Sequence, residues 1–230
     1  MFNRAPQPEL DETQIALIEA ALPHVVFDGW SADTLREAAR DAEIELSDAK
    51  RLFPRGGVDM ALGFHRLADQ RLKAELEASD LSSMRIRDRI THCVRRRIEL
   101  VGPEREAVRR GATLLALPIY APEGARAMWQ TADIIWTACG DTATDYNWYS
   151  KRAILSGVYS TTVLYWLGDQ DPDFHPTWAF LDRRIEGVMK FEKTKAQLKD
   201  NPVARAAFAI PAGLLGMIRA PGAGRASTET

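Results

Sequence analysis

The chain has 230 residues, of which 46% are hydrophobic and 27% charged, with 30 basic against 32 acidic side chains. These proportions are typical of a globular protein and exclude a wholly disordered, collagen-like or disulfide-stapled chain. The formal net charge of −2 also excludes a polycation that coats nucleic acid, so any basic surface must be local. Cys93 and Cys139 form no CxxC pair, which indicates two buried thiols rather than a zinc site. Because the first residues lack the apolar core of a signal peptide, we expect a cytosolic protein.

Periodic apolar residues, separated by Gly and Pro, predict a succession of helices along the first 80 residues. The expected ranges are 11–26, 31–39, 48–53 and 58–77. The side chains expected to cap the first three are Asp11 or Thr13, then Ser31, then Ser47. Two short helices separated by a tight break, over residues 31–53, are typical of a helix-turn-helix.

The remainder of the chain has helical periodicity too. Helices are expected over 84–101, from 103 to a stop at Pro118, from 122 to a stop at Gly140, over 142–167, and from 176 past 191. Asp141 or Thr142 is the expected cap of the long 142–167 helix. Since no convincing run alternates as a strand would, the sequence predicts an all-α fold.

The segment after Pro202 is apolar nearly all round, and the thirteen residues between Arg205 and Arg219 carry no charge. A bilayer-spanning helix needs roughly 20 apolar residues, so this segment is too short to cross. Lysines precede it, and a basic approach to a short apolar helix is typical of in-plane membrane contact. The alternative is a terminal helix docked on the core or on a second subunit. The expected membrane-contact residues are Phe208, Ile210, Leu214, Leu215, Met217 and Ile218.

The basic residues of the helix-turn-helix segment give only a weak indication of DNA binding. Lys50, Arg51 and Arg55 could meet phosphates, but Asp48 would face them as well. We therefore keep a ligand-responsive transcriptional regulator as the alternative function and expect no nucleic-acid partner.

Recognisable catalytic motifs are missing from the sequence. The four histidines, His24, His65, His92 and His175, lie outside HExxH and Glu-x-x-His patterns. There is no GxSxG, P-loop or GxGxxG motif either. The sequence therefore predicts structural histidines, no metal or cofactor, and no enzymatic activity.

Residues 136–166 carry the most informative pattern. Asp145, Trp148, Tyr149 and Arg152 are separated by three, four or seven residues, so they share one helix face, with Asn147 beside them. Aromatic residues beside charges near a helix start are typical of protein-binding hot spots. The alternative is that Trp148 joins the core while Asp145 and Arg152 form a local ion pair. Further along, an apolar stripe is expected to pack against a neighbouring helix: Leu155, Tyr159, Thr162 and Trp166.

This segment resembles the signature of the COQ9 family of ubiquinone-biosynthesis accessory proteins. The matching elements are Cys139-Gly140-Asp141, Thr144 to Tyr149, Arg152, Tyr159 to Thr162, an acidic loop at 169–173, and Thr177 to Leu181. A weaker similarity covers LFPRGGVDMALGFH at residues 52–65.

The resemblance implies a tetracycline-repressor-like helical fold with a degenerate helix-turn-helix, and a homodimer. It also implies binding of an isoprenoid lipid or ubiquinone intermediate, which is presented to a membrane-associated hydroxylase. The partner-binding patch would include Asp145, Asn147, Trp148, Tyr149 and Arg152. The implied organisation is a helix-turn-helix-like domain at 10–66, a lipid-binding and dimerisation domain at 67–198, a membrane-contact helix at 199–220 and a disordered tail at 221–230.

A helical domain rich in large apolar residues can leave a dry cavity for an isoprenoid tail. The candidate lining residues are Trp129, Ile134, Ile135, Trp136, Leu155, Tyr159 and Val163. The alternative is that these residues fill a solid core. Either way, we expect the protein to lie in the cytoplasm, peripheral to the inner face of the membrane.

Overall fold

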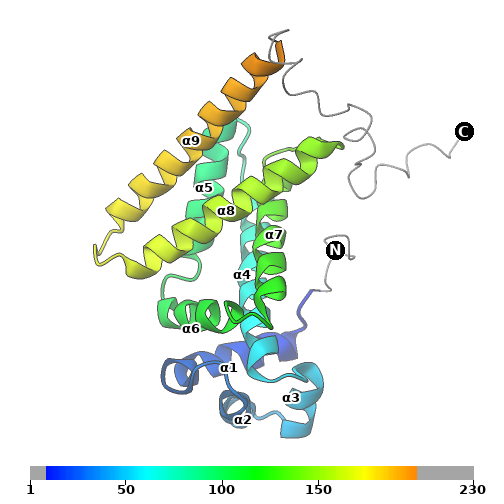
Figure 1. The fold of residues 1–230 in the computed structure, drawn as a ribbon. Coiled ribbons are helices and arrows are strands. Elements are labelled where there is room, and N and C mark those ends of the chain that lie inside the picture. Colours follow the sequence, from blue (N-terminus) through cyan, green and yellow to red (C-terminus); the bar gives the residue numbers. More distant parts are fainter. Residues whose placement is uncertain (1–8, 201–230) are drawn as a thin grey trace, which may run out of the picture. The chain divides into compact units, whose positions relative to one another are not determined.

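The computed structural model describes residues 9–200 and, within them, the side chains of residues 9–190 (Figure 1). Its helices are α1 (Glu12–Asp28), α2 (Ala32–Asp41), α3 (Leu46–Leu52), α4 (Gly57–Glu77), α5 (Ile86–Glu99), α6 (Arg105–Leu115), α7 (Ala121–Ala138), α8 (Tyr146–Gly168) and α9 (His175–Asp200). This part of the chain contains no strand, which confirms the all-α prediction. The expected membrane-contact residues, at 208–218, lie outside the described residues.

Side-chain caps set the first two helix starts as predicted. Asp11 accepts a hydrogen bond from the backbone N–H of Gln14 at 2.7 Å, and the Gln14 side chain accepts from Asp11 N–H at 3.2 Å. This reciprocal pair is a capping box. Ser31 caps α2 by accepting from the backbone N–H of Thr34 at 3.1 Å.

The predicted cap of α3 is wrong. The helix begins at Leu46, because the backbone carbonyl of Glu45 already accepts from the N–H groups of Asp48 and Ala49. Ser47 therefore lies inside the first turn, and Glu45 is the N-cap without a side-chain hydrogen bond.

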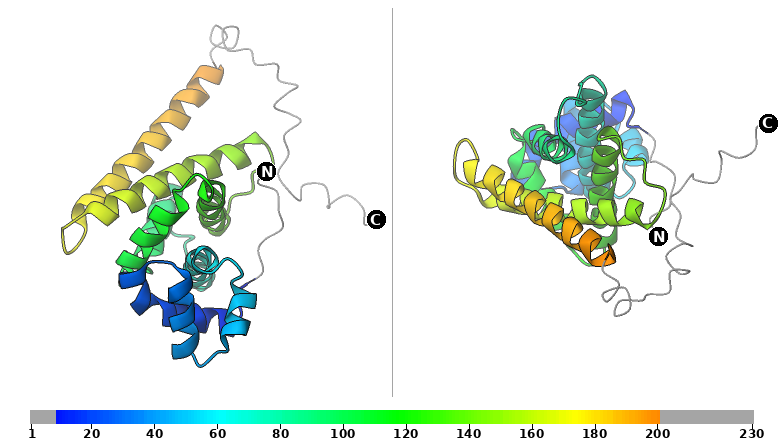
Figure 2. Two further views of the ribbon diagram at one scale, coloured as in Figure 1. Left: turned by 60° about the horizontal axis from the view of Figure 1, so that its bottom comes forward. Right: turned by 90° about the horizontal axis from the view of Figure 1, so that it is seen from above.

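The described part of the chain divides into two compact units: residues 9–80 with 93–131, and residues 81–92 with 132–200. In the first unit, α1, α2 and α3 gather around the start of α4 (Figure 2). Gly57 is required there, since a Cβ on it would lie 2.1 Å from the backbone oxygen of Trp30. Close packing therefore explains the last glycine of the PRGG sequence at residues 54–57, without any contact with nucleic acid. The expected division at residue 66 stays a prediction.

A buried ion pair lies deeper in the first unit. Arg97 donates through Nε to Asp69 at 2.7 Å, and both side chains are almost fully buried. Thr131 donates its hydroxyl to the same carboxylate at 2.9 Å, and the His65 ring hydrogen-bonds Thr131 at 2.9 Å. His65 is thus a structural histidine, as predicted. Because a buried carboxylate is stable only when its oxygens are bonded, this network fixes α4, α5 and α7 against each other.

In the second unit, α8 and α9 form an antiparallel helical pair joined by a short loop (Figures 1 and 2). Asp169 at the end of α8 accepts from both the backbone N–H and the hydroxyl of Thr177, at 3.0 and 2.5 Å. The predicted stripe is buried, as expected: Leu155, Tyr159, Thr162 and Trp166.

Both cysteines, Cys93 and Cys139, are buried free thiols, which confirms the prediction of two buried thiols.

Candidate functional site

The candidate site is the start of α8, in the second unit. Gly140, at φ 80, follows the end of α7 and turns the chain. α8 begins one residue after Asp145, whose carboxylate accepts from the backbone N–H of Asn147 at 2.9 Å and from its side-chain amide at 3.0 Å. The prediction that Asp141 or Thr142 caps this helix is therefore wrong.

Asp141 is unable to act as the cap because two cations hold it. Lys151 donates to one carboxylate oxygen at 2.7 Å, and Arg152 donates to the other at 2.8 Å. The Asp141 side chain is 1% exposed. Burial alone would raise its pKa, but the hydrogen bonds from Lys151 and Arg152 hold the pKa below its ordinary value. Asp141 is thus a buried, ionised carboxylate that binds the second turn of α8 through Lys151 and Arg152.

Arg152 contacts both Asp141 and the aromatic ring of Trp148. Its guanidinium also donates to Asp133 on α7 and to the backbone oxygen of Trp148, at 2.5 and 3.2 Å. The same guanidinium lies 4.0 Å from the centroid of the Trp148 ring, in a cation–π arrangement. Trp148 in turn meets Tyr149 edge to face, with ring centroids 4.8 Å apart. The alternative of a local pair between Asp145 and Arg152 is therefore wrong, since Arg152 is bonded elsewhere.

These contacts order a mixed polar and aromatic surface, which we name the α8 N-terminal patch. It consists of Asp145, Tyr146, Asn147, Trp148 and Tyr149. The rings of Trp148 and Tyr149 are half-buried, whereas Asp145 and Asn147 are exposed. Arg152, predicted as part of the same surface, is buried and supports the patch from beneath.

The sequence reasoning missed three contributors to this site. Tyr146 is 41% exposed and stands in the first turn of α8, next to the predicted residues. Its position in the run of aromatics at 146–149 was the available signal. Asp133 and Asp141 hold Arg152 in place by accepting its hydrogen bonds, and nothing in their local sequence indicates that role.

The seven candidate lipid-lining residues are divided between the two units. Trp129 belongs to the first unit, and the other six belong to the second. Ile135, Leu155 and Tyr159 are buried, whereas Ile134, Trp136 and Val163 are half-buried. The indole N–H of Trp136 donates to the backbone oxygen of Lys151 at 3.1 Å, which joins α7 to α8. The role of these residues in lipid binding stays a prediction.

Two hollows stand out in the described part of the chain, both in the first unit. The larger, about 380 Å³, is an open polar depression at the α2–α3 turn, lined by Arg36, Ala39, Arg40, Glu43, Ile44, Glu45 and Leu46. The smaller, about 30 Å³, lies between α4 and α7 and is lined by Leu62, Arg66, Glu123, Arg126, Ala127 and Gln130. Neither hollow is lined by a candidate lipid residue.

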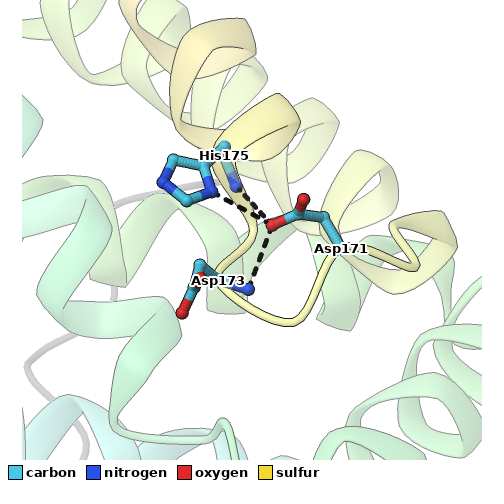
Figure 3. Close-up of side chains that lie close together, drawn as sticks. All are labelled: Asp171, Asp173 and His175. Carbon is cyan, nitrogen blue, oxygen red and sulfur yellow. Dashed lines mark hydrogen bonds and ion pairs between the residues drawn. The ribbon is translucent and has the colours of Figure 1, made fainter.

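The acidic loop before α9 gathers Asp171, Asp173 and His175, whose ligand-type atoms all lie within 4.8 Å of one another (Figure 3). One oxygen of Asp171 accepts from the backbone N–H of Asp173 at 3.0 Å, the backbone N–H of His175 at 3.2 Å and the His175 ring at 3.2 Å. These bonds, above all the one from the backbone of His175, hold the pKa of Asp171 below its ordinary value. The hydrogen bonds within this cluster therefore order the start of α9.

Two of the basic side chains considered for DNA contact are in ion pairs. Arg51 pairs with Asp48 inside α3, while Arg55 pairs with Asp59 and with Glu123 of α7. Lys50 is exposed. The α3 surface therefore presents less uncompensated positive charge than its sequence indicates.

Within the described residues, no helix is long and apolar enough to cross a membrane.

Solved structures place the fold in a known class. A TetR transcriptional regulator from Nitrosomonas europaea ATCC 19718 superposes with a TM-score of 0.63, covering 76% of this chain and 97% of that one, at 18% sequence identity. At this identity the likeness concerns the fold alone. The chain therefore has a tetracycline-repressor-like helical fold, as the sequence predicts.

Sequence relatives identify the family. The profile of the COQ9 family matches residues 121–192, a range that includes the α8 N-terminal patch. The mitochondrial ubiquinone biosynthesis protein COQ9-B of Xenopus laevis is 30% identical over 213 residues, 90% of this chain and 71% of that protein. Rat and human COQ9 are 32% and 31% identical over 196 residues, 82% of this chain. The chain belongs to the COQ9 family, and it spans 62% and 61% of the length of the rat and human proteins.

Proposed function

We propose that the protein acts in ubiquinone biosynthesis as a lipid-binding accessory protein rather than as an enzyme. In this role it binds an isoprenoid quinone intermediate and presents it to a membrane-associated hydroxylase. The observation that carries the proposal is the family membership, whose profile match spans the α8 N-terminal patch. Its curated relatives are named as ubiquinone biosynthesis proteins.

The physical reason for such a protein is the insolubility of the intermediate. A polyprenyl quinone stays in the bilayer because transferring its apolar tail to water is costly, at about 0.8 kcal/mol per CH₂. An accessory protein must therefore offer a second apolar environment while it exposes the head group to the hydroxylase. The proposed lining comes from α7 and α8, and α8 also carries the α8 N-terminal patch.

The α8 N-terminal patch suits a docking role because its aromatic rings are held before any partner arrives. Trp148 is stacked by Arg152, which Asp141 and Asp133 hold in turn. Less side-chain freedom is then lost on binding, so more of the contact energy contributes to affinity. Half-buried Trp and Tyr side chains are also the residue types enriched at binding hot spots.

We further propose a homodimer and a cytoplasmic position, peripheral to the inner face of the membrane. Residues 208–218 supply the apolar contact in this proposal. Removal of residues 200–230 is expected to release the protein from liposomes in a flotation assay. Undiminished binding would show that the contact lies elsewhere.

The main test is organic extraction of the purified full chain, followed by mass spectrometry of the lipids. A polyprenyl quinone or precursor at near-stoichiometric amounts is expected, and a helical protein of similar size from the same cells serves as the control. Generic phospholipid alone, or no lipid at all, would refute quinone binding.

Docking is tested separately by capture of the pathway hydroxylase on immobilised protein. Trp148→Lys is expected to weaken capture, and Leu164→Lys is the matched control, since Leu164 is a 64% exposed residue of the same helix. Circular dichroism of both variants verifies the fold. Equal capture by the two variants would remove the patch from the interface.

The alternative function is a ligand-responsive transcriptional regulator. Its supporting observation is the tetracycline-repressor-like fold with α2 and α3 in the helix-turn-helix position. Selection from genomic fragments should then enrich one short palindrome, with binding that falls steeply as salt rises. Failure to enrich a sequence at low salt would dismiss this function.

A further inference from the structure

Two arginines of the first unit differ from all the others that the structure describes there. Arg66 on α4 and Arg126 on α7 form no hydrogen bond or ion pair with any described residue. Their neighbours show the usual pattern: Arg71 on α4 pairs with Glu19, for example, and Arg97 pairs with Asp69. Both unpaired side chains are half-buried, so water does not fully compensate their charge.

The two side chains line the same small hollow, of about 30 Å³, between α4 and α7. The Nε atom of Arg66 is buried and lacks a hydrogen-bond partner. A buried N–H without an acceptor is costly, and such groups in folded proteins usually mark a missing water, ion or ligand. Gln130, one helical turn beyond Arg126, also lines the hollow and brings an amide that can donate.

The one carboxylate that lines the hollow is already compensated. Glu123 accepts two hydrogen bonds from Arg55, at 2.7 and 2.8 Å, and these bonds hold its pKa below the ordinary value. Arg55 also pairs with Asp59, whose charge reaches Arg66 only through space. Arg66, Arg126 and Arg55 together oppose two carboxylates, which leaves an excess of one positive charge around the hollow.

We propose that this recess binds a phosphate group, with Arg66 and Arg126 as its ligands. A water molecule would satisfy the Arg66 Nε–H but would leave the excess positive charge around the hollow uncompensated. A tetrahedral phosphate offers oxygens in several directions, so it can accept from Arg66 on α4 and from Arg126 and Gln130 on α7. The hollow is large enough to take one phosphate oxygen, since about 10–15 Å³ is enough to hold a water molecule. The rest of the group remains at the surface, and it belongs either to free phosphate or to a phospholipid headgroup.

The first experiment titrates inorganic phosphate into the full chain at constant ionic strength and measures Kd by calorimetry. Arg66→Gln and Arg126→Gln are each expected to weaken binding about tenfold or more, because each removes a charge-assisted donor. Arg66→Lys keeps the charge but loses Nε–H, so an intermediate Kd is expected. Arg71→Gln is the matched control, since it removes an exposed arginine of the same helix. No binding by the wild type, or equal Kd values in all variants, would overturn the site.

The second experiment distinguishes the two sources of the phosphate group. Vesicles of phosphatidylcholine, with and without phosphatidic acid, are mixed with the same variants and separated by flotation. A headgroup ligand predicts that Arg66→Gln and Arg126→Gln reduce binding to the phosphatidic acid vesicles. A soluble ligand predicts unchanged flotation together with the weakened calorimetric Kd. If Arg66→Gln fails to fold, the more peripheral Arg126→Gln and Arg66→Lys carry both comparisons.

Discussion

Asp141→Asn removes the negative charge that pairs with Lys151 and Arg152 of α8. The loss in unfolding free energy can be estimated from the contacts that remain. Breaking a buried ion pair by removing one partner costs about 3–5 kcal/mol. Here Arg152 keeps Asp133 and the backbone oxygen of Trp148 as acceptors, and Asn keeps one oxygen. We therefore expect the free energy of unfolding to fall by about 2–3 kcal/mol, below the full penalty. Urea denaturation at pH 7 measures it.

The pH dependence of the same variant gives an independent check. The folded-state pKa of Asp141 lies below its ordinary value, which is about 3.9 in an unfolded chain. Its contribution is thus fully present above about pH 4–5 and is lost as the pH falls through the folded pKa. The difference in unfolding free energy between wild type and Asp141→Asn should stay constant from neutral pH down to about pH 5, then narrow in acid.

Asp133→Asn is the matched control, because Asp133 binds the same guanidinium from a side chain that is 44% exposed. Solvent screens this pair, so its loss should cost about 1 kcal/mol or less. The reasoning fails if Asp133→Asn costs as much as Asp141→Asn, or if the Asp141 variant shows the acid dependence of the wild type.

Three further substitutions test the fold by urea denaturation. Gly57→Ala should cost about 3 kcal/mol, because its Cβ would strike the backbone of Trp30; a neutral effect would contradict the close approach. Glu43→Gly should stabilise by about 0.5–1 kcal/mol, since Glu43 has φ 54, which favours glycine; destabilisation would count against the strain. Thr177→Val should cost about 2 kcal/mol by removing the hydroxyl donor to buried Asp169, and a value near zero would mean that water replaces it.

Local signals in the sequence were sufficient for most helix positions. Asp11 and Ser31 cap helices through bonds to residues three positions on, so the pattern and the geometry use the same short range. The break before α4 is likewise local, because Pro54 comes immediately after Phe53, the residue that caps the end of α3. α3 begins two residues before its predicted start, because the carbonyl of Glu45 already accepts helical hydrogen bonds from Asp48 and Ala49, and no side-chain cap marks this start.

The start of α8 shows where a local reading fails. Asp141 has the residue type and the position of a cap, and only its partners ten and eleven residues further on explain why it is not one. The same contacts bury Arg152, which spacing alone places on the surface with Asp145. Helical periodicity says which residues share a face, but it does not say which face the neighbouring helix covers.

Asp141 also gives a test that links the support of the patch to docking. In the docking proposed above, if Asp141 affects capture of the hydroxylase only by holding Arg152 against Trp148, then Asp141→Asn should weaken capture, and by less than Trp148→Lys. The double variant should then bind no more weakly than Trp148→Lys alone, because the contact that Asp141 supports is already gone. Capture assays on the three variants, each verified by circular dichroism, measure this coupling. Additive losses would mean that Asp141 affects docking by a route that does not pass through Trp148.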